Sequence, residues 1–115
     1  MKYGTTCYIC GPMTILKHAC YNFHQFFYWQ VKLEKSGYKV INPAEEDCKR
    51  ALYSEWFPTQ EEYETILAGD LKMIEEKADW LFVLKGSDKS PGAQREIERA
   101  EELNIPVFYE EKEIV

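Results

Sequence analysis

The chain has 115 residues, of which 45% are hydrophobic and 15% aromatic, and its formal net charge is −6. These values predict one folded domain with a modest core and argue against a disordered chain. The negative charge argues against binding along DNA or RNA, although backbone amides could still hold a small anion. No apolar run has the length of a membrane span or the pattern of a signal peptide, so we expect a cytoplasmic protein.

The first predicted element is a strand over residues 5–11, which is rich in β-branched and aromatic residues and ends at a Gly11-Pro12 turn. A helix is predicted next, over residues 22–36, and Gly37 suits the position just after its end. This helix carries more aromatic residues than one buried face needs. We therefore expect an apolar patch that a second copy of the chain covers.

Two of the four cysteines, Cys7 and Cys10, are three positions apart in the first predicted strand. Side chains three apart on a strand point to opposite faces, which argues against a shared zinc ion or a redox pair. The other two, Cys20 and Cys48, are isolated in the sequence and offer no second pair of ligands. We therefore expect buried or idle thiols, with no metal centre and no disulfide.

The rest of the chain continues the alternation of strands and helices. The segment over residues 44–60, which contains Trp56 and Phe57, has no regular period, and we expect it to cover the site or form a subunit contact. Ser90 and Pro91 are typical of an N-cap and a first helical position. The predicted strands are residues 38–42, 78–84 and 106–109, the predicted helices are residues 61–77 and 91–103, and an acidic tail over residues 110–113 follows.

The complete order of predicted elements is β-α-β-α-β-α-β. This order predicts a parallel sheet with helices on both faces. The expected fold class is α/β: a small flavodoxin- or Rossmann-like three-layer sandwich with a parallel sheet of four to five strands, in a single domain over residues 1–115. In such a sheet, ligands bind at the carboxyl ends of the strands, where helix N-termini also meet.

A carboxylate near this edge is the main candidate for catalysis. Glu96 lies in the first turns of the last predicted helix, where the helix dipole favours the ionised form. An ionised, positioned carboxylate can attack an anomeric carbon and form a glycosyl-enzyme intermediate. The residues alone leave a plainer interpretation open, in which Glu96 is solvated and pairs with Arg95 or Arg99.

Other polar residues also have more than one interpretation. Asp70, in the helix before the third strand, either lies on the surface or points toward the ligand-binding edge. Asp79 would fix a turn or bind backbone amides, and Tyr8 is most simply a core aromatic residue. The loop between Ser87 and Ser90 could hold a phosphate on its amides, although it lacks the P-loop pattern.

Three short motifs follow one another in a fixed order: Tyr8-Ile9-Cys10-Gly11-Pro12, then Asp70 with Ala78-Asp79, then Ser90-x-Gly92-x-x-x-Glu96. In order and spacing they resemble the nucleoside 2-deoxyribosyltransferase superfamily, including its branch of nucleoside 5′-monophosphate N-glycosidases. The resemblance covers most of the chain. The segments over residues 21–23 and 37–45 resemble a branch of this group that is common in phage genomes and has no assigned function.

The resemblance implies a role for each matching residue. Glu96 would be the nucleophile at C1′ of a deoxyribose, Asp70 would assist the departing base, and Tyr8 would orient the sugar or the nucleophile. At the position of Ser90, the transferases usually have an acidic residue, whereas the monophosphate hydrolases have a serine. A hydroxyl tolerates a 5′-phosphate that a carboxylate would repel. The implied substrate-binding residues are Gly11, Pro12, Ser90 and Gly92.

We therefore expect an enzyme that cleaves the N-glycosidic bond of a deoxynucleoside 5′-monophosphate or a deoxynucleoside, with hydrolysis favoured over base transfer. The resemblance implies a small-molecule substrate, no metal or organic cofactor, and a homo-oligomer. For a phage-encoded protein, the cytoplasm would be that of the host. The alternative is a binding module that holds a nucleotide-derived ligand without turning it over.

Overall fold

The computed structural model describes residues 4–12, 23–45 and 60–110, which form a parallel sheet and the helices that cover it. The sheet has the strand order β2-β1-β3-β4, with every neighbouring pair parallel. The predicted α/β fold class is therefore confirmed. The strands are β1 (Thr6–Cys10), β2 (Lys39–Ile41), β3 (Trp80–Val83) and β4 (Val107–Tyr109); the helices are α1 (Phe23–Lys35), α3 (Gln60–Lys77), the short 3₁₀ helix η1 (Ser87–Lys89) and α4 (Pro91–Glu102).

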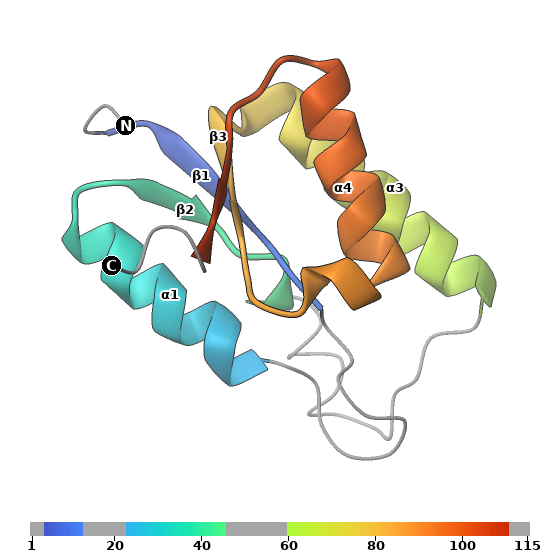
Figure 1. Ribbon diagram of the computed structural model, residues 1–115, viewed down its shortest axis with the longest axis horizontal. Coiled ribbons are helices and arrows are strands. Elements are labelled where there is room, and N and C mark those ends of the chain that lie inside the picture. The colour runs from blue at the N-terminus through green and yellow to red at the C-terminus, as the bar shows by residue number, and fades with distance from the viewer. Residues whose placement is uncertain (1–3, 13–22, 46–59, 111–115) are drawn as a thin grey trace.

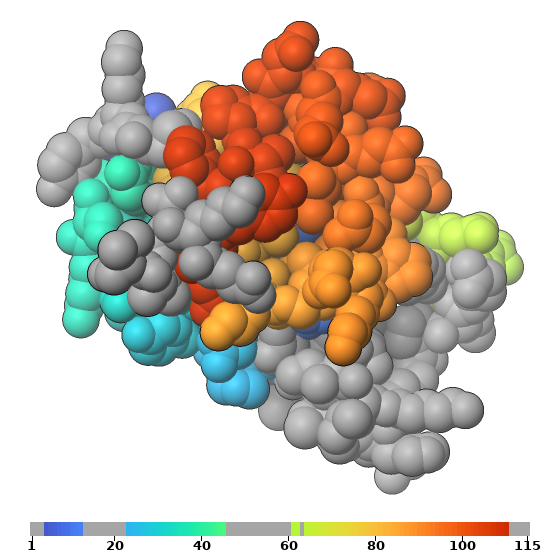
Figure 2. Space-filling model, viewed as in Figure 1, coloured from blue at the N-terminus to red at the C-terminus, as the bar shows by residue number. Residues whose placement is uncertain are grey.

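The helices lie in two layers on opposite faces of the sheet, with α1 on one face and α3 and α4 on the other (Figure 1). The side chains of β1 alternate accordingly. Cys7 and Ile9 pack with α1, whereas Tyr8 and Cys10 pack with α3 and α4. All four are fully buried, and little of the blue β1 segment is visible on the face shown in Figure 2. The two cysteines therefore lie on opposite faces of the sheet, as their spacing predicts.

Strands β1 and β3 form the centre of the sheet and end at the same edge. Their register pairs Cys10 with Val83, the last residue of each strand. Strand β2 lies on one side of β1, while β3 and β4 lie on the other, so the strand order reverses between β1 and β3. Ligands of open α/β sheets bind outside the carboxyl ends of the strands at such a reversal.

Local sequence signals account for several helix ends. Gly37, just after α1, has a φ of +97°, and Asn104, just after α4, has a φ of 57°. Both residue types tolerate this left-handed conformation better than others do. At the start of α4, the Ser90 hydroxyl accepts a hydrogen bond from the Ala93 amide at 3.2 Å, and Pro91 is the first helical residue. The predicted N-cap is confirmed.

The core of a single chain uses most of the aromatic residues of α1. Tyr28 and Val31 remain on the surface, with 53% and 49% of their area exposed. The predicted homo-oligomer therefore has less support from this helix than its composition suggests, and it stays a prediction. The side chains of α1 that are buried or packed against the core are Phe23, Phe26, Phe27, Trp29 and Leu33.

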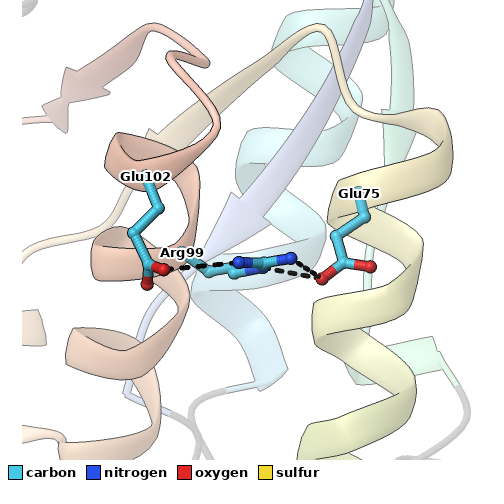
Figure 3. Close-up of polar contacts among 3 residues, drawn as sticks. All are labelled: Glu75, Arg99 and Glu102. Carbon is cyan, nitrogen blue, oxygen red and sulfur yellow. Dashed lines mark hydrogen bonds and ion pairs between the residues drawn. The ribbon is translucent and has the colours of Figure 1, made fainter.

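An arginine on α4 links the two helices that share one face of the sheet (Figure 3). The Arg99 guanidinium lies 2.5 Å from a Glu75 oxygen on α3 and 3.3 Å from a Glu102 oxygen on α4. These pairs are partly exposed to solvent, so each contributes little to the free energy of unfolding. They nevertheless show that α3 and α4 lie side by side.

Some predictions fall on residues that the structure does not describe. These are the N-terminal residue of the predicted 22–36 helix, the thiols of Cys20 and Cys48, and the segment with Trp56 and Phe57. Among the described residues, none of the helices combines the length and the apolar character that crossing a membrane requires.

Candidate functional site

The carboxylate of Glu96 is buried, with 6% of the residue exposed. Glu96 lies in the second turn of α4, and its neighbours Ala93 and Ile97 pack against the sheet from the same helix. The interpretation of Glu96 as a solvated residue of an exposed helix face is therefore wrong. A buried carboxylate costs free energy unless hydrogen-bond donors surround it, so its partners matter.

Two side chains of β1 reach this carboxylate. The Tyr8 hydroxyl donates a hydrogen bond to Oε2 of Glu96, and the Cys10 thiol lies 3.5 Å from Oε1. Because residues 8 and 10 share one face of the strand, each of them can approach a different oxygen. Strand β1 thus supplies a donor to both oxygens of Glu96, and Tyr8 is more than a core aromatic residue.

Tyr8 and Cys10 keep their protons near neutral pH and can therefore donate to the carboxylate. Burial raises the pKa of the Tyr8 hydroxyl and of the Cys10 thiol well above their ordinary values, and the negative charge of Glu96 raises both pKa values further. Asp70 raises both pKa values as well, so its charge acts at the same place. Half-buried on α3, Asp70 lies on the same side of the sheet as Glu96.

The predicted substrate-binding residues Gly11 and Pro12 follow β1 at the carboxyl edge of the sheet. A Cβ atom on Gly11 would lie 2.9 Å from the Leu84 side chain, so glycine lets the ends of β1 and β3 pack closely. Pro12 lies beside Gly86, where a Cβ atom would be 3.4 Å from the proline ring. Packing therefore explains Gly11 without a substrate, and contact of these residues with a substrate stays a prediction.

The loop between β3 and α4 holds its shape through its own hydrogen bonds. The Ser87 hydroxyl donates to the Leu84 carbonyl at 2.7 Å, and the Gln94 side-chain amide donates to the Ser87 carbonyl at 3.0 Å. Ser90 and the half-buried Gly92 lie at the N-terminal end of α4, where this loop ends. Both predicted residues are thus at the helix start that precedes Glu96.

Sequence reasoning missed the role of Glu110, which the predicted acidic tail includes. Glu110 is 9% exposed and accepts two hydrogen bonds, from the Trp29 indole N–H at 3.0 Å and from the Lys85 backbone N–H at 2.6 Å. It joins the end of β4 to α1 and to the loop after β3. Its donors are 81 and 25 residues away along the chain, so no local pattern points to them.

Two other predictions can be compared directly with the structure. The Asp79 carboxylate accepts a hydrogen bond from the Thr6 backbone N–H at 2.8 Å, which confirms that it binds a backbone amide. Cys7 and Cys10 are free, buried thiols. In the ranges that the structure describes, no three His, Cys, Asp or Glu side chains are grouped as a metal ion would require.

Comparisons with known proteins place the chain in a family without assigning it an activity. No curated protein and no solved structure matches it. The family that matches does so over residues 5–109, a range that includes all four strands of the sheet and Glu96. Since this range is nearly the whole chain, the protein belongs to the family described as "Domain of unknown function (DUF4406)".

Proposed function

We propose that the protein cleaves the N-glycosidic bond of a deoxynucleoside 5′-monophosphate or a deoxynucleoside, and that hydrolysis is favoured over base transfer. The observation that carries this proposal is the hydrogen bond from the Tyr8 hydroxyl to the buried Glu96 carboxylate. The bond holds a potential nucleophile beside the last residues of β1, and such folds bind ligands outside the carboxyl ends of their strands. The resemblance to nucleoside 2-deoxyribosyltransferases supports the same roles for both residues.

In the first step, a Glu96 oxygen attacks C1′ of the sugar through an oxocarbenium-like transition state. The bond between C1′ and the base nitrogen breaks, and its electron pair leaves with the base. Water supplies the proton that the departing base takes up, or Asp70 supplies it once the carboxyl of Asp70 is itself protonated. The Tyr8 hydroxyl keeps the carboxylate in one orientation before the attack, which reduces the entropic cost of reaching the transition state.

In the second step, water attacks C1′ of the glycosyl-enzyme intermediate. The bond from C1′ to the Glu96 oxygen breaks, and the carboxylate is restored as the water proton passes to Asp70 or to solvent. A second base in place of water would give transfer. The sugar and the free base leave as the products of hydrolysis.

A 5′-phosphate on the substrate is favoured by the start of α4. Ser90 has a hydroxyl rather than a carboxylate, and the N-terminal end of a helix attracts anions. The amides of this turn are partly used already, since the Ala93 N–H is bonded to Ser90. The absence of basic residues from the Met13-Thr14-Ile15 segment, which lies outside the described residues, argues for a free 5′-hydroxyl.

The test is product analysis by HPLC on deoxynucleosides and their matched 5′-monophosphates, using the wild type, Glu96→Gln and Glu98→Gln. Glu98 is exposed on the same helix and serves as the matched control. We expect free base from the wild type and from Glu98→Gln, and a loss of roughly a thousandfold or more in Glu96→Gln. Unchanged turnover in Glu96→Gln would exclude Glu96 as the nucleophile. A wild type that releases no free base from any of these compounds would contradict the enzymatic proposal.

The second candidate is a binding module for a nucleotide-derived ligand. It is favoured by the low exposure of Glu96, because a nucleophile must be reached by the sugar that it attacks. A ligand that binds only the folded state raises the apparent stability of the protein. A thermal-shift series with the same compounds would therefore show a rise in Tm without release of the base. This combination would favour the binding module over the enzyme.

A further inference from the structure

The Cys10 thiol lies between two acceptors on α4. Its sulfur is 3.5 Å from Oε1 of Glu96 and 3.5 Å from the carbonyl oxygen of Ala93, one turn earlier on the helix. Cys10 is fully buried, so water does not compete for its single proton. This contact is independent of the bond from Tyr8, which reaches the other oxygen of Glu96.

The surroundings keep the thiol protonated. Burial raises the pKa of Cys10, and the charges of Glu96 and Asp70 raise this pKa further. Within the part of the chain that the structure describes, the ionisable groups that interact at this place with Glu96 include Tyr8 and Cys10 on β1 and Asp70 on α3. Strand β4 adds Tyr109 to the same core, whereas β3 presents only the apolar side chains of Leu81 and Val83.

We propose that Cys10 is a positioning residue for Glu96: its thiol donates to Oε1, stabilises the ionised carboxylate and limits its rotation. The Ala93 carbonyl lies at the same distance and competes for the same proton, and we assign that proton to Oε1 because a charged carboxylate oxygen is the stronger acceptor. The role of Cys10 in turnover rests on the proposed function. Its effect on the ionisation of Glu96 does not depend on any activity.

A thiol suits this position because it is a weaker donor than a hydroxyl. It holds Oε1 while withdrawing less negative charge from it than a second hydroxyl would. Removal of a donor to a carboxylate disfavours the charged form, so Cys10→Ala should raise the pKa of Glu96. Cys10→Ser keeps a donor, so it should leave this pKa at or below the wild-type value.

The experiment follows the Glu96 carboxyl carbon by ¹³C NMR during a pH titration of the full chain, with the signal assigned by its loss in Glu96→Gln. We expect Cys10→Ala to raise the pKa of Glu96 by about half a pH unit or more relative to the wild type. Cys7→Ala is the matched control, because Cys7 is equally buried but lies on the opposite face of β1. It should leave the titration of Glu96 unchanged.

Several outcomes would overturn the proposal. One is an unchanged Glu96 titration in Cys10→Ala, and another is an equal shift in Cys7→Ala, which would indicate a general loosening of the core. If Cys10→Ala does not fold, the test rests on Cys10→Ser. A pKa of Glu96 above the wild-type value in Cys10→Ser would contradict a hydrogen bond from the side chain of residue 10 to Glu96.

The pH profile of kcat/KM connects the effect to turnover. Its acidic limb reports the ionisation of the free enzyme, so it should move by the same amount as the NMR titration. A limb that does not move with the titration would overturn the role of Cys10 in turnover. If the wild type turns over no substrate, the proposed function fails while the NMR titration still decides the role of Cys10.

Discussion

The pairing of Tyr8 with Glu96 affects both the stability of the fold and its chemistry. Glu96 has 6% of its area exposed, so the loss of one donor leaves a buried oxygen without compensation for its lost water. We expect Tyr8→Phe to lower the free energy of unfolding by about 1–3 kcal/mol, measured by urea denaturation at neutral pH. Tyr28→Phe, at a side chain that is 53% exposed, should change it by less than about 0.5 kcal/mol. Equal effects of the two substitutions would contradict a stabilising role of the Tyr8 bond.

At the scale of residues, the sequence could indicate candidates but not their contacts. Glu96 and Tyr8 can be selected from motif spacing, yet they are 88 positions apart, and only the folded sheet shows that they touch. Cys10 illustrates the same limit. Its burial could be predicted, but its two acceptors belong to a helix that the local sequence does not connect to it.

At the scale of elements, Glu110 connects three parts of the fold through one side chain. Its carboxylate accepts from Trp29 on α1 and from the Lys85 amide at the start of the loop toward α4. In Glu110→Gln, the amide nitrogen would face one of these donors, so we expect a loss of about 1–3 kcal/mol in the free energy of unfolding. Hydrogen exchange at the Lys85 amide should also become faster. Glu101→Gln, at an exposed position of α4, is the control, and a similar loss there would contradict the special role of Glu110.

The order of the elements could be predicted because its signals are local. Hydrophobic period and turn residues lie within each segment, as at Gly37 and at the Ser90-Pro91 start of α4. The 3₁₀ helix at Ser87–Lys89 lies inside a segment predicted as a loop, since three residues are too short for a period. The partners of Glu110 were missed because tertiary contacts, not local pattern, decide which charged residues are buried.

At the scale of the whole molecule, the described residues include three ionisable groups that the core holds neutral: Cys7, Tyr8 and Cys10. Burial is the main cause, and it raises the pKa of each above the ordinary values of 9.0 for cysteine and 10.0 for tyrosine. Below about pH 8 all three are protonated in the folded and the unfolded state, so their contribution to stability is fully present. At higher pH the unfolded chain releases protons that the folded chain retains, so folding becomes less favourable.

We therefore expect these three groups to leave the free energy of unfolding unchanged from neutral pH to about pH 8 and to lower it at higher pH, by up to about 1.4 kcal/mol per pH unit for each cysteine that ionises only when unfolded. Urea denaturation at a series of pH values measures this slope. Cys7→Ala removes one such group from the face of the sheet opposite Glu96. The free energy of unfolding of this variant should therefore fall less steeply with pH than that of the wild type, by the contribution of one cysteine. Identical slopes in the two proteins would show that Cys7 ionises as readily in the folded state as in the unfolded chain. That result would contradict its burial in the core.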